Sequence, residues 1–388
     1  PGLIILDEEH DASFKQQDGF RYSARDIAVK RAAELNIPIV LGTATPSLES
    51  LRNAEQGRYA WHRLRERATP AALPHWRVLD LRQQKTFHGL TQSALDSIGQ
   101  TLEQGEQVMV FLNRRGYAPV LMCHQCGWHG HCERCDANMT WHKGIRRLTC
   151  HQSGSQKRAP ELCPACRADA LMGAGEGTQQ LEEALAKRFP GMPVLRFDRD
   201  RVRGKGVMDR QLEEVLTGDP CILVGTQMLA KGHHFPNVTL VVIVNIDQAM
   251  YSADFRELER MGQMLVQVSG RAGRMKKTGT VILQTLHPDH SALKLLLSEG
   301  YEAYARWLLE ERSLAGLPPL THQALLRAEA HDKNLARTFL QQAMERFPDG
   351  EAVAHGPLPA LMERMGGRSR MYLVVMSATR SGLHQQLD

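Results

Sequence analysis

Three carboxylates and a histidine follow a short apolar run near the start of the sequence, in the string IILDEEH (4–10). At the carboxyl end of a parallel strand, one carboxylate can hold Mg²⁺ and its neighbour can orient a water molecule for phosphoryl transfer. We therefore consider Asp7 as a magnesium ligand and Glu8 as the group that activates water. A solvated acidic turn could have the same letters, so this interpretation needs support from other parts of the sequence.

Three later motifs supply groups that phosphoryl transfer also uses. GTATP (42–46) follows the next apolar run and would bring the hydroxyls of Thr43 and Thr45 beside the acids, although alone it is typical of a helix-capping turn. QVSGRAGR (267–274) presents two arginines, and guanidinium groups supplied to a triphosphate by a neighbouring domain raise hydrolysis rates by ~10³ to 10⁵. GTQMLAKGHHFP (225–236) begins where another strand should end. The order of these motifs favours phosphoryl transfer more than any one of them does.

Seven of the eight cysteines lie between positions 123 and 166. Six of them form three C-x-x-C pairs, the spacing with which a tight turn presents two thiolates to one tetrahedral zinc ion. A disulfide framework is the alternative, and the lack of a secretion signal in the sequence argues against it. The candidate zinc ligands are Cys123, Cys126, Cys132, Cys135, Cys150, Cys163 and Cys166.

A second four-cysteine site would need one more cysteine than this region contains. Ser153 stands where C-x-x-C spacing after Cys150 would place it, and a hydroxyl is a poor zinc ligand beside a thiolate. Either His151 completes the second site or its metal is weakly held, so we expect one to two zinc ions. The remaining cysteine, Cys221, opens an apolar run and is interpreted as a core residue.

The formal net charge of +5 is concentrated in one region. Residues 110–170 contain nine Lys or Arg against four Asp or Glu, a surplus as large as that of the whole sequence. A local positive field suggests a polyanion partner such as nucleic acid, although a solvated surface could have the same composition. Trp128 and Trp141, in the same region, could stack on bases or split a strand junction, or could cover the metal.

The elements that must position these residues alternate between apolar strands and helices, which predicts a parallel sheet. Residues 63–84, rich in Pro and Arg, are expected to be a connection. From about residue 287 the pattern becomes helical, then αβ, and it ends in a hairpin-like segment, 366–378, without an obvious closing element. Strands are expected at 4–7, 37–42, 193–198, 221–226, 240–247 and 281–285 and at the start of 107–117, and helices at 24–35, 92–104, 178–189 and 210–216.

Neither a membrane span nor a targeting segment is expected. The longest apolar stretch, 238–244, is far shorter than the ~18 residues that a membrane span requires. No segment with a charged and then apolar leader pattern is present at the start. We therefore expect a cytoplasmic protein that does not bind a membrane.

The strings LDEEH, GTATPS, NRRGY, GTQMLAKGHHFP and QVSGRAGR resemble motifs II to VI of superfamily 2 helicases. The NRRGY start, the cysteine insert and the GHHFP loop are similar to the PriA (primosomal protein N′) family of bacterial replication-restart DNA helicases. The resemblance extends over nearly the whole sequence and implies an α/β fold with RecA-like lobes. It implies an incomplete first lobe (1–75), a complete second lobe (76–286) with a zinc-ribbon insert (123–170), and a truncated α+β C-terminal domain (287–388).

The resemblance also implies roles for residues around the nucleotide. Asp7 would coordinate Mg²⁺ and Glu8 would activate water for ATP hydrolysis. Gln267, Arg271 and Arg274 would face the phosphates across the cleft between the lobes. In the ribbon, the nested pairing of the family would place Cys123, Cys126, Cys163 and Cys166 in an outer metal site and would leave Cys132, Cys135 and Cys150 in an incomplete inner one.

Further residues would, by the same resemblance, bind DNA or couple DNA to the nucleotide site. An aromatic-rich loop at 14–22 would sense single strands, because its aromatic rings are interleaved with cations; a packed surface segment is the alternative. The residues of that loop are Phe14, Lys15, Phe20, Arg21 and Tyr22. The other implied residues are His10, Thr43, Thr45, Arg114, Arg115, Gly225, Thr226, Gln227 and Lys231.

The sequence departs from the family pattern in three further places. Gln179 stands where an acid is expected, and Arg201 stands where a Thr is usual. No G-x-x-x-x-G-K-[ST] phosphate loop occurs, and without it Asp7 and Glu8 have no held nucleotide to act on. We therefore expect the chain to be the carboxyl-terminal portion of a longer enzyme, with the phosphate loop upstream of Pro1, and to be inactive alone.

The predicted function is that of an ATP-dependent 3′–5′ DNA helicase, with Zn²⁺, Mg²⁺ and ATP as cofactors. It would act on single-stranded and forked DNA at stalled replication structures, with single-stranded DNA-binding protein and primosome proteins as partners. A non-enzymatic zinc-ribbon DNA-binding scaffold with degenerate lobes is the alternative, and the missing phosphate loop would favour it if Pro1 were the true start. An RNA helicase with the same core is a further alternative.

Overall fold

The computed structural model describes most of the chain, and it divides the chain into two compact units. One unit comprises residues 1–113 and 182–311, and the other comprises residues 114–181 and 312–388. Each unit is described by itself. The described residues are 2–16, 19–64, 73–113, 120–123, 125–135, 137–142, 145–150, 153–174, 178–197, 207–226, 229, 235–244, 246–252, 254–273 and 277–387.

The first unit begins with a two-stranded parallel sheet of β1 (Ile4–Asp7) and β2 (Ile39–Gly42). The 3₁₀ helix η1 (Ala12–Phe14) follows β1. Helices α1 (Ala24–Glu34) and α2 (Leu48–Glu55) follow the two strands, and a serine caps each helix. The Ser23 hydroxyl accepts a hydrogen bond from the Asp26 N–H, and the Ser47 hydroxyl accepts one from the Ser50 N–H, as expected for N-cap residues.

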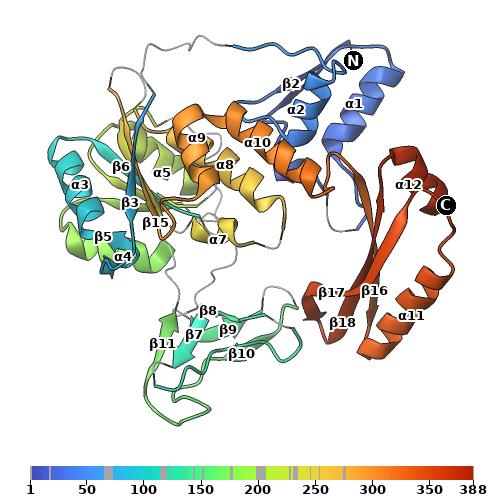
Figure 1. Cartoon of the computed structure of the whole chain (residues 1–388). Helices are drawn as coiled ribbons and strands as arrows, with labels where there is room; N and C mark the ends of the chain where they lie inside the picture. The colour runs from blue at the N-terminus through green and yellow to red at the C-terminus, as the bar shows by residue number, and fades with distance from the viewer. Residues whose placement is uncertain are drawn as a thin grey trace. The chain divides into compact units, whose positions relative to one another are not determined.

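A six-stranded, wholly parallel sheet forms the centre of the first unit (Figure 1). Its central strands read as nearly continuous apolar runs because helices cover a parallel sheet on both faces. Strand β6 is buried along its whole length. The strand order is β12 (Val194–Phe197), β13 (Ile222–Gly225), β6 (Gln107–Leu112), β14 (Val238–Val244), β15 (Thr280–Thr285) and β3 (His75–Asp80).

The helices around this sheet confirm the α/β fold class. Helix α3 packs against β6 and β14, and a short hairpin of β4 (Thr86–Phe87) and β5 (Leu90–Thr91) precedes it. No helix of the described part is long and apolar enough to cross a membrane. The helices are α3 (Gln92–Glu103), α4 (Thr178–Arg188), α5 (Val207–Leu216), α7 (Asp247–Met250), α8 (Glu257–Ser269), α9 (Ser291–Glu299) and α10 (Tyr301–Leu314).

The second unit contains a five-stranded antiparallel sheet that carries the cysteines. Its small core is formed by Leu121, Met139, Leu148 and buried cysteines, with Trp128 and Trp141 packed against it. The two tryptophans therefore pack against the cluster that contains Cys132, Cys135 and Cys150, while their roles toward metal or bases stay predictions. The strand order is β10 (Gln156–Arg158), β9 (Arg147–Thr149), β8 (Thr140–His142), β7 (Val120–Cys123) and β11 (Leu171–Ala174).

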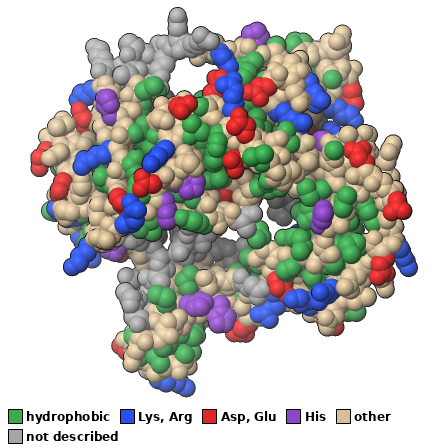
Figure 2. Space-filling model, in the orientation of Figure 1, with side chains coloured by type: hydrophobic (Ala, Val, Ile, Leu, Met, Phe, Trp, Pro, Cys, Tyr) green, Lys and Arg blue, Asp and Glu red, His purple; other side chains and the backbone are tan. Residues whose placement is uncertain are grey.

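The rest of the second unit is an α+β domain with a three-stranded antiparallel sheet in the order β16 (His322–Ala330), β18 (Arg368–Ser377) and β17 (Val353–Met365). Helices α11 (Lys333–Glu345) and α12 (Arg380–Leu387) pack against Met371, Leu373 and Val375 of β18. These three residues alternate along the strand, so both helices lie on one face of the sheet. Figure 2 shows hydrophobic side chains over these strands, and Leu325 is among the exposed ones.

Several elements, among them α2, α7 and α8, were not expected from the sequence, and two parts of the chain contradict the expectation. Residues 63–84 were expected to be a connection, but they contain β3, whose apolar residues are interrupted by charged ones because it lies at the edge of the sheet. After residue 378 no closing element was expected, and α12 is present there. Its apolar content is low, and Leu383 is its main contribution to the core.

Candidate functional site

Asp7 and Glu8 lie at the carboxyl end of β1 and are exposed to solvent. Asp7 is paired in register with Gly42 of β2. The backbone of Glu8 has a φ of 50°, so the chain turns sharply at this residue, and the Glu8 N–H donates to Asp7 Oδ1 at 3.0 Å. Two carboxylates at an open strand end are suitable ligands for a hard divalent cation and its water molecules.

Glu9, by contrast, is buried and holds three segments together. Its side chain is only 1% exposed. The Ser47 N–H donates to it at 2.7 Å, the Ser50 hydroxyl at 2.9 Å and an Arg25 guanidinium nitrogen at 2.9 Å. Burial alone would lower the pKa of Arg25, but the carboxylates of Glu49 and Glu9 outweigh it and raise that pKa. Glu9 therefore anchors the turn that presents Asp7 and Glu8.

His10 lies among the predicted hydroxyl residues. Its Nδ1 is 2.7 Å from Thr43 Oγ1, and Thr45 Oγ1 is 3.4 Å from the ring nitrogens. The same Nδ1 lies 3.5 Å from Glu8 Oε2. The structure thus brings the residues of LDEEH and GTATP together, as expected from strand ends at one edge of a sheet, while their roles stay predictions.

Gln267 connects this cluster to helix α8. Its amide nitrogen Nε2 lies 2.8 Å from His10 Nε2. A second contact joins the same helix to α2, because the buried Glu259 carboxylate accepts a hydrogen bond from the Leu48 N–H at 3.0 Å. We name Asp7, Glu8, His10, Thr43, Thr45 and Gln267 the motif cluster.

The arginine motif begins in α8 and leaves it at its carboxyl end. Arg271 is half-buried, and its N–H donates to the Val268 carbonyl at 3.0 Å. Gly273 has a φ of +65°, and a Cβ there would lie 2.0 Å from the Gly279 nitrogen, so only glycine fits. Arg274 lies outside the described residues, so its predicted place opposite Asp7 stays a prediction.

The GTQ motif begins at the end of β13. A Cβ at Gly225 would lie 2.7 Å from the Phe197 carbonyl oxygen, which accounts for the glycine. The Thr226 carbonyl accepts a hydrogen bond from the Leu229 N–H at 3.0 Å. Four further predicted residues lie outside the described part of the chain: Gln227, Lys231, Arg114 and Arg115.

The aromatic-rich loop presents its rings to solvent. Lys15 and Ser23 form an antiparallel bridge, and the Gln16 N–H donates to the Tyr22 carbonyl at 2.8 Å. Phe20 is 85% exposed, and its ring centroid lies 6.3 Å from that of Tyr22. Phe14 is half-buried, whereas Lys15, Arg21 and Tyr22 are exposed. Exposed rings beside cations can stack on unpaired bases, which a packed surface segment could not do.

The outer cysteines form a four-sulfur cluster that fits a zinc ion. The Sγ atoms of Cys123, Cys126, Cys163 and Cys166 all lie within 4.8 Å of one another, and all four are free thiols. The Cys123–Cys166 and Cys126–Cys163 sulfur distances are 3.6 and 3.5 Å. A tetrahedral zinc with bonds of ~2.3 Å places its sulfurs about 3.8 Å apart. The predicted outer set of ligands is confirmed as a cluster.

The inner cysteines form a three-sulfur cluster with a hydroxyl beside it. The Sγ atoms of Cys132, Cys135 and Cys150 lie within 4.8 Å of one another, and all three residues are buried. Ser153 Oγ lies 3.6 Å from Cys132 Sγ. The donor set therefore fits zinc with three thiolates, and Ser153 lies near the fourth position; His151 lies outside the described residues.

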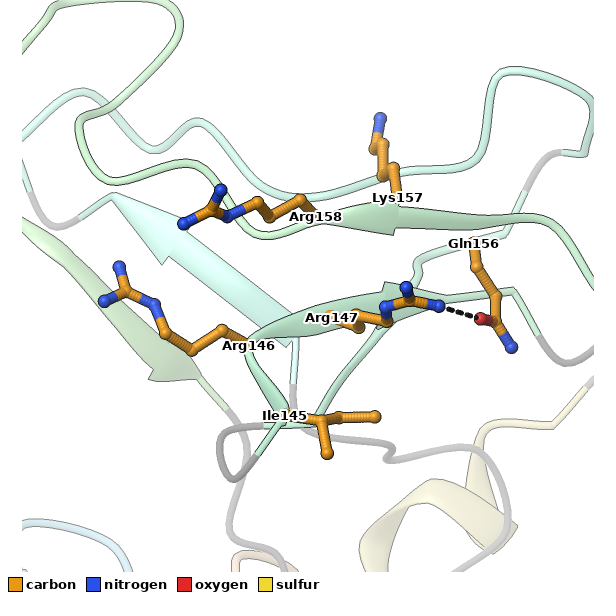
Figure 3. A pocket seen from close by; sticks show the side chains of 6 residues that line it. All are labelled: Ile145, Arg146, Arg147, Gln156, Lys157 and Arg158. Atoms are coloured by element: carbon orange, nitrogen blue, oxygen red, sulfur yellow. Dashed lines mark hydrogen bonds between the residues drawn. The ribbon is translucent and has the colours of Figure 1, made fainter.

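A groove on the β9–β10 hairpin of the ribbon is rich in cations (Figure 3). Arg147 and Arg158 are cross-strand partners and so lie on one face, where Arg147 donates to Gln156 at 3.0 Å. Arg146 and Arg158 each lie 3.8 Å from the one carboxylate of Glu161, so this acid neutralises only part of their charge. We name the lining residues the basic strip: Ile145, Arg146, Arg147, Gln156, Lys157 and Arg158.

The sequence analysis missed the residues that support these sites. Arg25, Ser47 and Glu259 hold the acidic turn and α2 in place. The S-L-E-S string at 47–50 is typical of a helix N-cap and could have indicated Ser47. No local signal marks Arg25 or Glu259, because their partners are distant in sequence.

Three family descriptions match parts of the chain. "PriA DNA helicase Cys-rich region (CRR) domain" matches residues 132–158, and "Primosomal protein N C-terminal domain" matches residues 313–388. "Helicase conserved C-terminal domain" matches residues 174–276. Each match falls on an element already described: the ribbon, the α+β domain and the six-stranded sheet.

Curated relatives match the chain over nearly all its residues. The "Replication restart protein PriA" of Haemophilus influenzae is 47% identical over 390 residues, which is 100% of this chain and 53% of the relative. That of Bacillus subtilis is 36% identical, over 96% of this chain and 47% of the relative. The chain thus spans about half the length of these relatives. A solved structure of "S. cerevisiae Dbp5 bound to RNA and ADP BeF3" matches 81% of this chain and 62% of the Dbp5 chain. The sequence identity is 14% and the TM-score is 0.41, and a likeness that low supports no conclusion.

Proposed function

The chain belongs to the PriA family of replication restart proteins, and from that premise we propose that it forms the hydrolysing and DNA-engaging part of an ATP-dependent DNA helicase. The proposal covers 3′–5′ movement on single-stranded and forked DNA. It also covers the initiation of primosome assembly, with single-stranded DNA-binding protein and primosome proteins as partners. The phosphate loop that the motif cluster requires would be supplied by a longer protein that contains this chain.

The hydrogen bond between Gln267 and His10 is the observation that carries this proposal. His10 is 2.7 Å from Thr43 and lies two residues after the exposed Glu8, while Gln267 lies one turn before Arg271. A group that lies between two helicase motifs can transmit a change at one of them to the other. The motif cluster therefore has the connections that a coupled ATPase needs, and a degenerate lobe would have no reason to keep them.

In the proposed reaction, Asp7 would hold Mg²⁺ and Glu8 would position the attacking water. Bound Mg²⁺ would neutralise charge on the phosphate oxygens of ATP. Glu8 is suited to its role because it is exposed and next to Asp7, and because its side chain also approaches His10. Arg271, together with Arg274, would stabilise charge that develops on the phosphates.

DNA is proposed to contact two separate surfaces. The exposed rings of Phe20 and Tyr22 would stack on bases of the single strand. The basic strip would follow the phosphate backbone through Arg147 and Arg158, and such contacts supply affinity without reading sequence. Zinc in the outer cysteine cluster would keep the ribbon folded, so that the basic strip is held on a rigid hairpin.

The test is DNA-stimulated ATP hydrolysis by the complete protein with its phosphate loop present. Glu8→Gln should lower turnover at least ~100-fold while single-strand affinity stays within about twofold, because the change removes a water-positioning carboxylate and leaves the DNA contacts. Glu34→Gln is the matched control, since Glu34 is an exposed acid of α1 that pairs only with Lys30 among the described residues for which an ion pair is given.

Three outcomes would contradict the proposal or a part of it. Wild-type protein without DNA-stimulated turnover would favour the scaffold interpretation. Turnover that RNA stimulates as strongly as DNA does would favour an RNA helicase. A normal rate in Glu8→Gln would remove Glu8 from the reaction.

A further inference from the structure

The β17–β18 hairpin of the α+β domain ends in a two-residue turn, Gly366–Gly367. Both glycines have positive φ, 63° and 82°, as a two-residue hairpin turn of type I′ requires. This turn contacts the ribbon at Arg134, whose carbonyl accepts a hydrogen bond from the Gly367 N–H at 2.7 Å. The Arg134 guanidinium in turn donates to the Gly366 carbonyl at 3.2 Å. Two hydrogen bonds in opposite directions therefore join the turn to one ribbon residue.

A third hydrogen bond from the same turn ends on a candidate metal ligand. The Gly366 N–H donates to Cys135 Sγ at 3.2 Å. Met365, which precedes the turn, packs against the ribbon cluster that contains Cys132, Cys135 and Cys150. A residue more than 200 positions away in sequence thus supplies a hydrogen bond to the inner cluster.

The chemistry of the inner cluster gives this hydrogen bond a function. Three thiolates around one Zn²⁺ carry an excess of negative charge, and Ser153 adds no charge while its hydroxyl stays protonated. An N–H donor aimed at a ligating sulfur stabilises that charge and fixes the orientation of the ligand. The ribbon does the same once from within, because the Arg134 N–H lies 3.4 Å from Cys132 Sγ.

We infer that the Gly366–Gly367 turn is part of the inner metal site, so that zinc bound by Cys132, Cys135 and Cys150 and docking of the β17–β18 hairpin on the ribbon stabilise each other. Coupling of this kind is reciprocal in affinity: whatever strengthens docking raises the affinity for zinc, and zinc loss weakens docking by the same factor. The inference requires zinc in the inner cluster and does not depend on ATP hydrolysis.

The first experiment measures zinc release from the full chain into an excess of a colorimetric chelator. Met365→Glu places a carboxylate beside the thiolates and opposes docking, and Arg134→Ala removes the guanidinium contact with Gly366 without touching a ligand. Each should lower the affinity for one zinc by about 10- to 100-fold, the loss typical of a disturbed outer-shell partner, and leave the outer zinc unchanged. At an unchanged binding rate, the release of that zinc becomes faster by the same factor. Arg158→Ala is the control, because it removes the same charge from an exposed strand of the same ribbon.

The second experiment reverses the direction. Cys150→Ser should weaken zinc binding at the inner site. Hydrogen exchange followed by mass spectrometry then measures how fast the backbone N–H groups of Met365 to Arg368 exchange with solvent. These should exchange at least ~10-fold faster than in the wild type, whereas α11 should keep its protection because its own core is unchanged.

The inference is overturned if Met365→Glu and Arg134→Ala both release zinc at the rate of Arg158→Ala. It is also overturned if exchange in the turn is the same with and without Cys150. Loss of protection throughout the α+β domain would contradict it as well, because coupling through the docked turn predicts a local change.

Discussion

Glu8 and Glu9 are adjacent in sequence and lie in opposite environments. Glu8 is exposed to solvent, whereas Glu9 is buried and is hydrogen-bonded to Ser47, Ser50 and Arg25. The positive φ of Glu8 separates the two, because it turns the chain between them. Removing one partner of a buried ion pair costs stability, while changing an exposed acid rarely does.

Glu9→Gln should therefore destabilise the first unit by about 3 kcal/mol, since the Arg25 guanidinium would lose its buried carboxylate partner. Chemical denaturation followed by tryptophan fluorescence or circular dichroism measures the change. Glu8→Gln is the matched control and should stay within about 0.5 kcal/mol of the wild type. Equal stability of the two variants would show that Glu9 does not anchor the turn.

At this scale the sequence predicted the groups with a chemical signature and missed their supports. Asp7, His10 and Thr43 could be placed together because strand ends of a parallel sheet share an edge. Arg25 and Glu259 act through contacts with residues far away in the chain, and no local pattern reports such contacts. The left-handed backbone at Glu8 was equally invisible, because glutamate has no preference for it.

Among the elements, α8 carries the largest share of the site. It supplies Gln267 to the motif cluster and Glu259 to α2, and it leads into the arginine motif. Its Gly262 lies against Tyr304 of α10, where an added Cβ would be 2.3 Å from the ring. Tyr304 is fully buried, and its hydroxyl donates to the Leu258 carbonyl at 2.5 Å, so the ring has little room to move.

Gly262→Ala should accordingly destabilise the protein by about 1 to 3 kcal/mol, the cost typical of overpacking. Gly99→Ala in α3 is the control: its new Cβ would be at an ordinary 3.5 Å from the Phe189 ring, and the change should stabilise by about 0.5 to 1 kcal/mol. Urea denaturation of the two variants measures both. Opposite signs are expected, and a neutral Gly262→Ala would mean that α8 and α10 separate at no cost.

The basic strip makes a prediction about salt. The association constant for duplex DNA falls as the salt concentration rises, and each phosphate contact adds about one unit to the slope of the log–log plot. Replacing both Arg147 and Arg158 by Ala should therefore reduce the magnitude of that slope by about two. Fluorescence anisotropy at several salt concentrations measures it. The double variant Arg337→Ala and Arg346→Ala removes two exposed cations from α11 and its end, and it should leave the slope unchanged. The same slope in both would exclude the basic strip from DNA binding.

Strands β1 and β2, five of the six strands of the large sheet and helices α1, α3, α4 and α5 could be predicted from sequence, because mostly apolar runs alternate there with helical segments. Strand β3 was missed because an edge strand needs fewer apolar residues. The ribbon strands are only three or four residues long and are held by cysteine clusters, so they have no periodicity to detect.

In the whole molecule, the large parallel sheet and the ribbon obtain stability from different sources. The sheet buries residues such as Val110, Phe111 and Val242 completely, whereas the ribbon core is small and contains cysteines. A structural zinc can supply ~10 to 16 kcal/mol of apparent binding free energy, which a core of this size cannot replace.

Chelation of zinc should therefore unfold the ribbon and spare the sheet. With excess EDTA, peptides from 120–174 should lose hydrogen-exchange protection, while β6 and β14 keep it. Refilling with Zn²⁺ should restore the protection. Protection of the ribbon that survives verified metal removal would show that its fold does not depend on the metal.

Strand β3 lies at the edge of the six-stranded sheet, and its partner β15 begins some 200 residues later. At a synthesis rate of ~5 to 20 residues per second, β3 leaves the ribosome on the order of ten to forty seconds before β15 exists. During that interval the strand has no native hydrogen-bonding partner, and the nascent chain must keep it from pairing elsewhere. The order of translation, and not only the strength of the final contacts, thus determines when this edge of the sheet is completed.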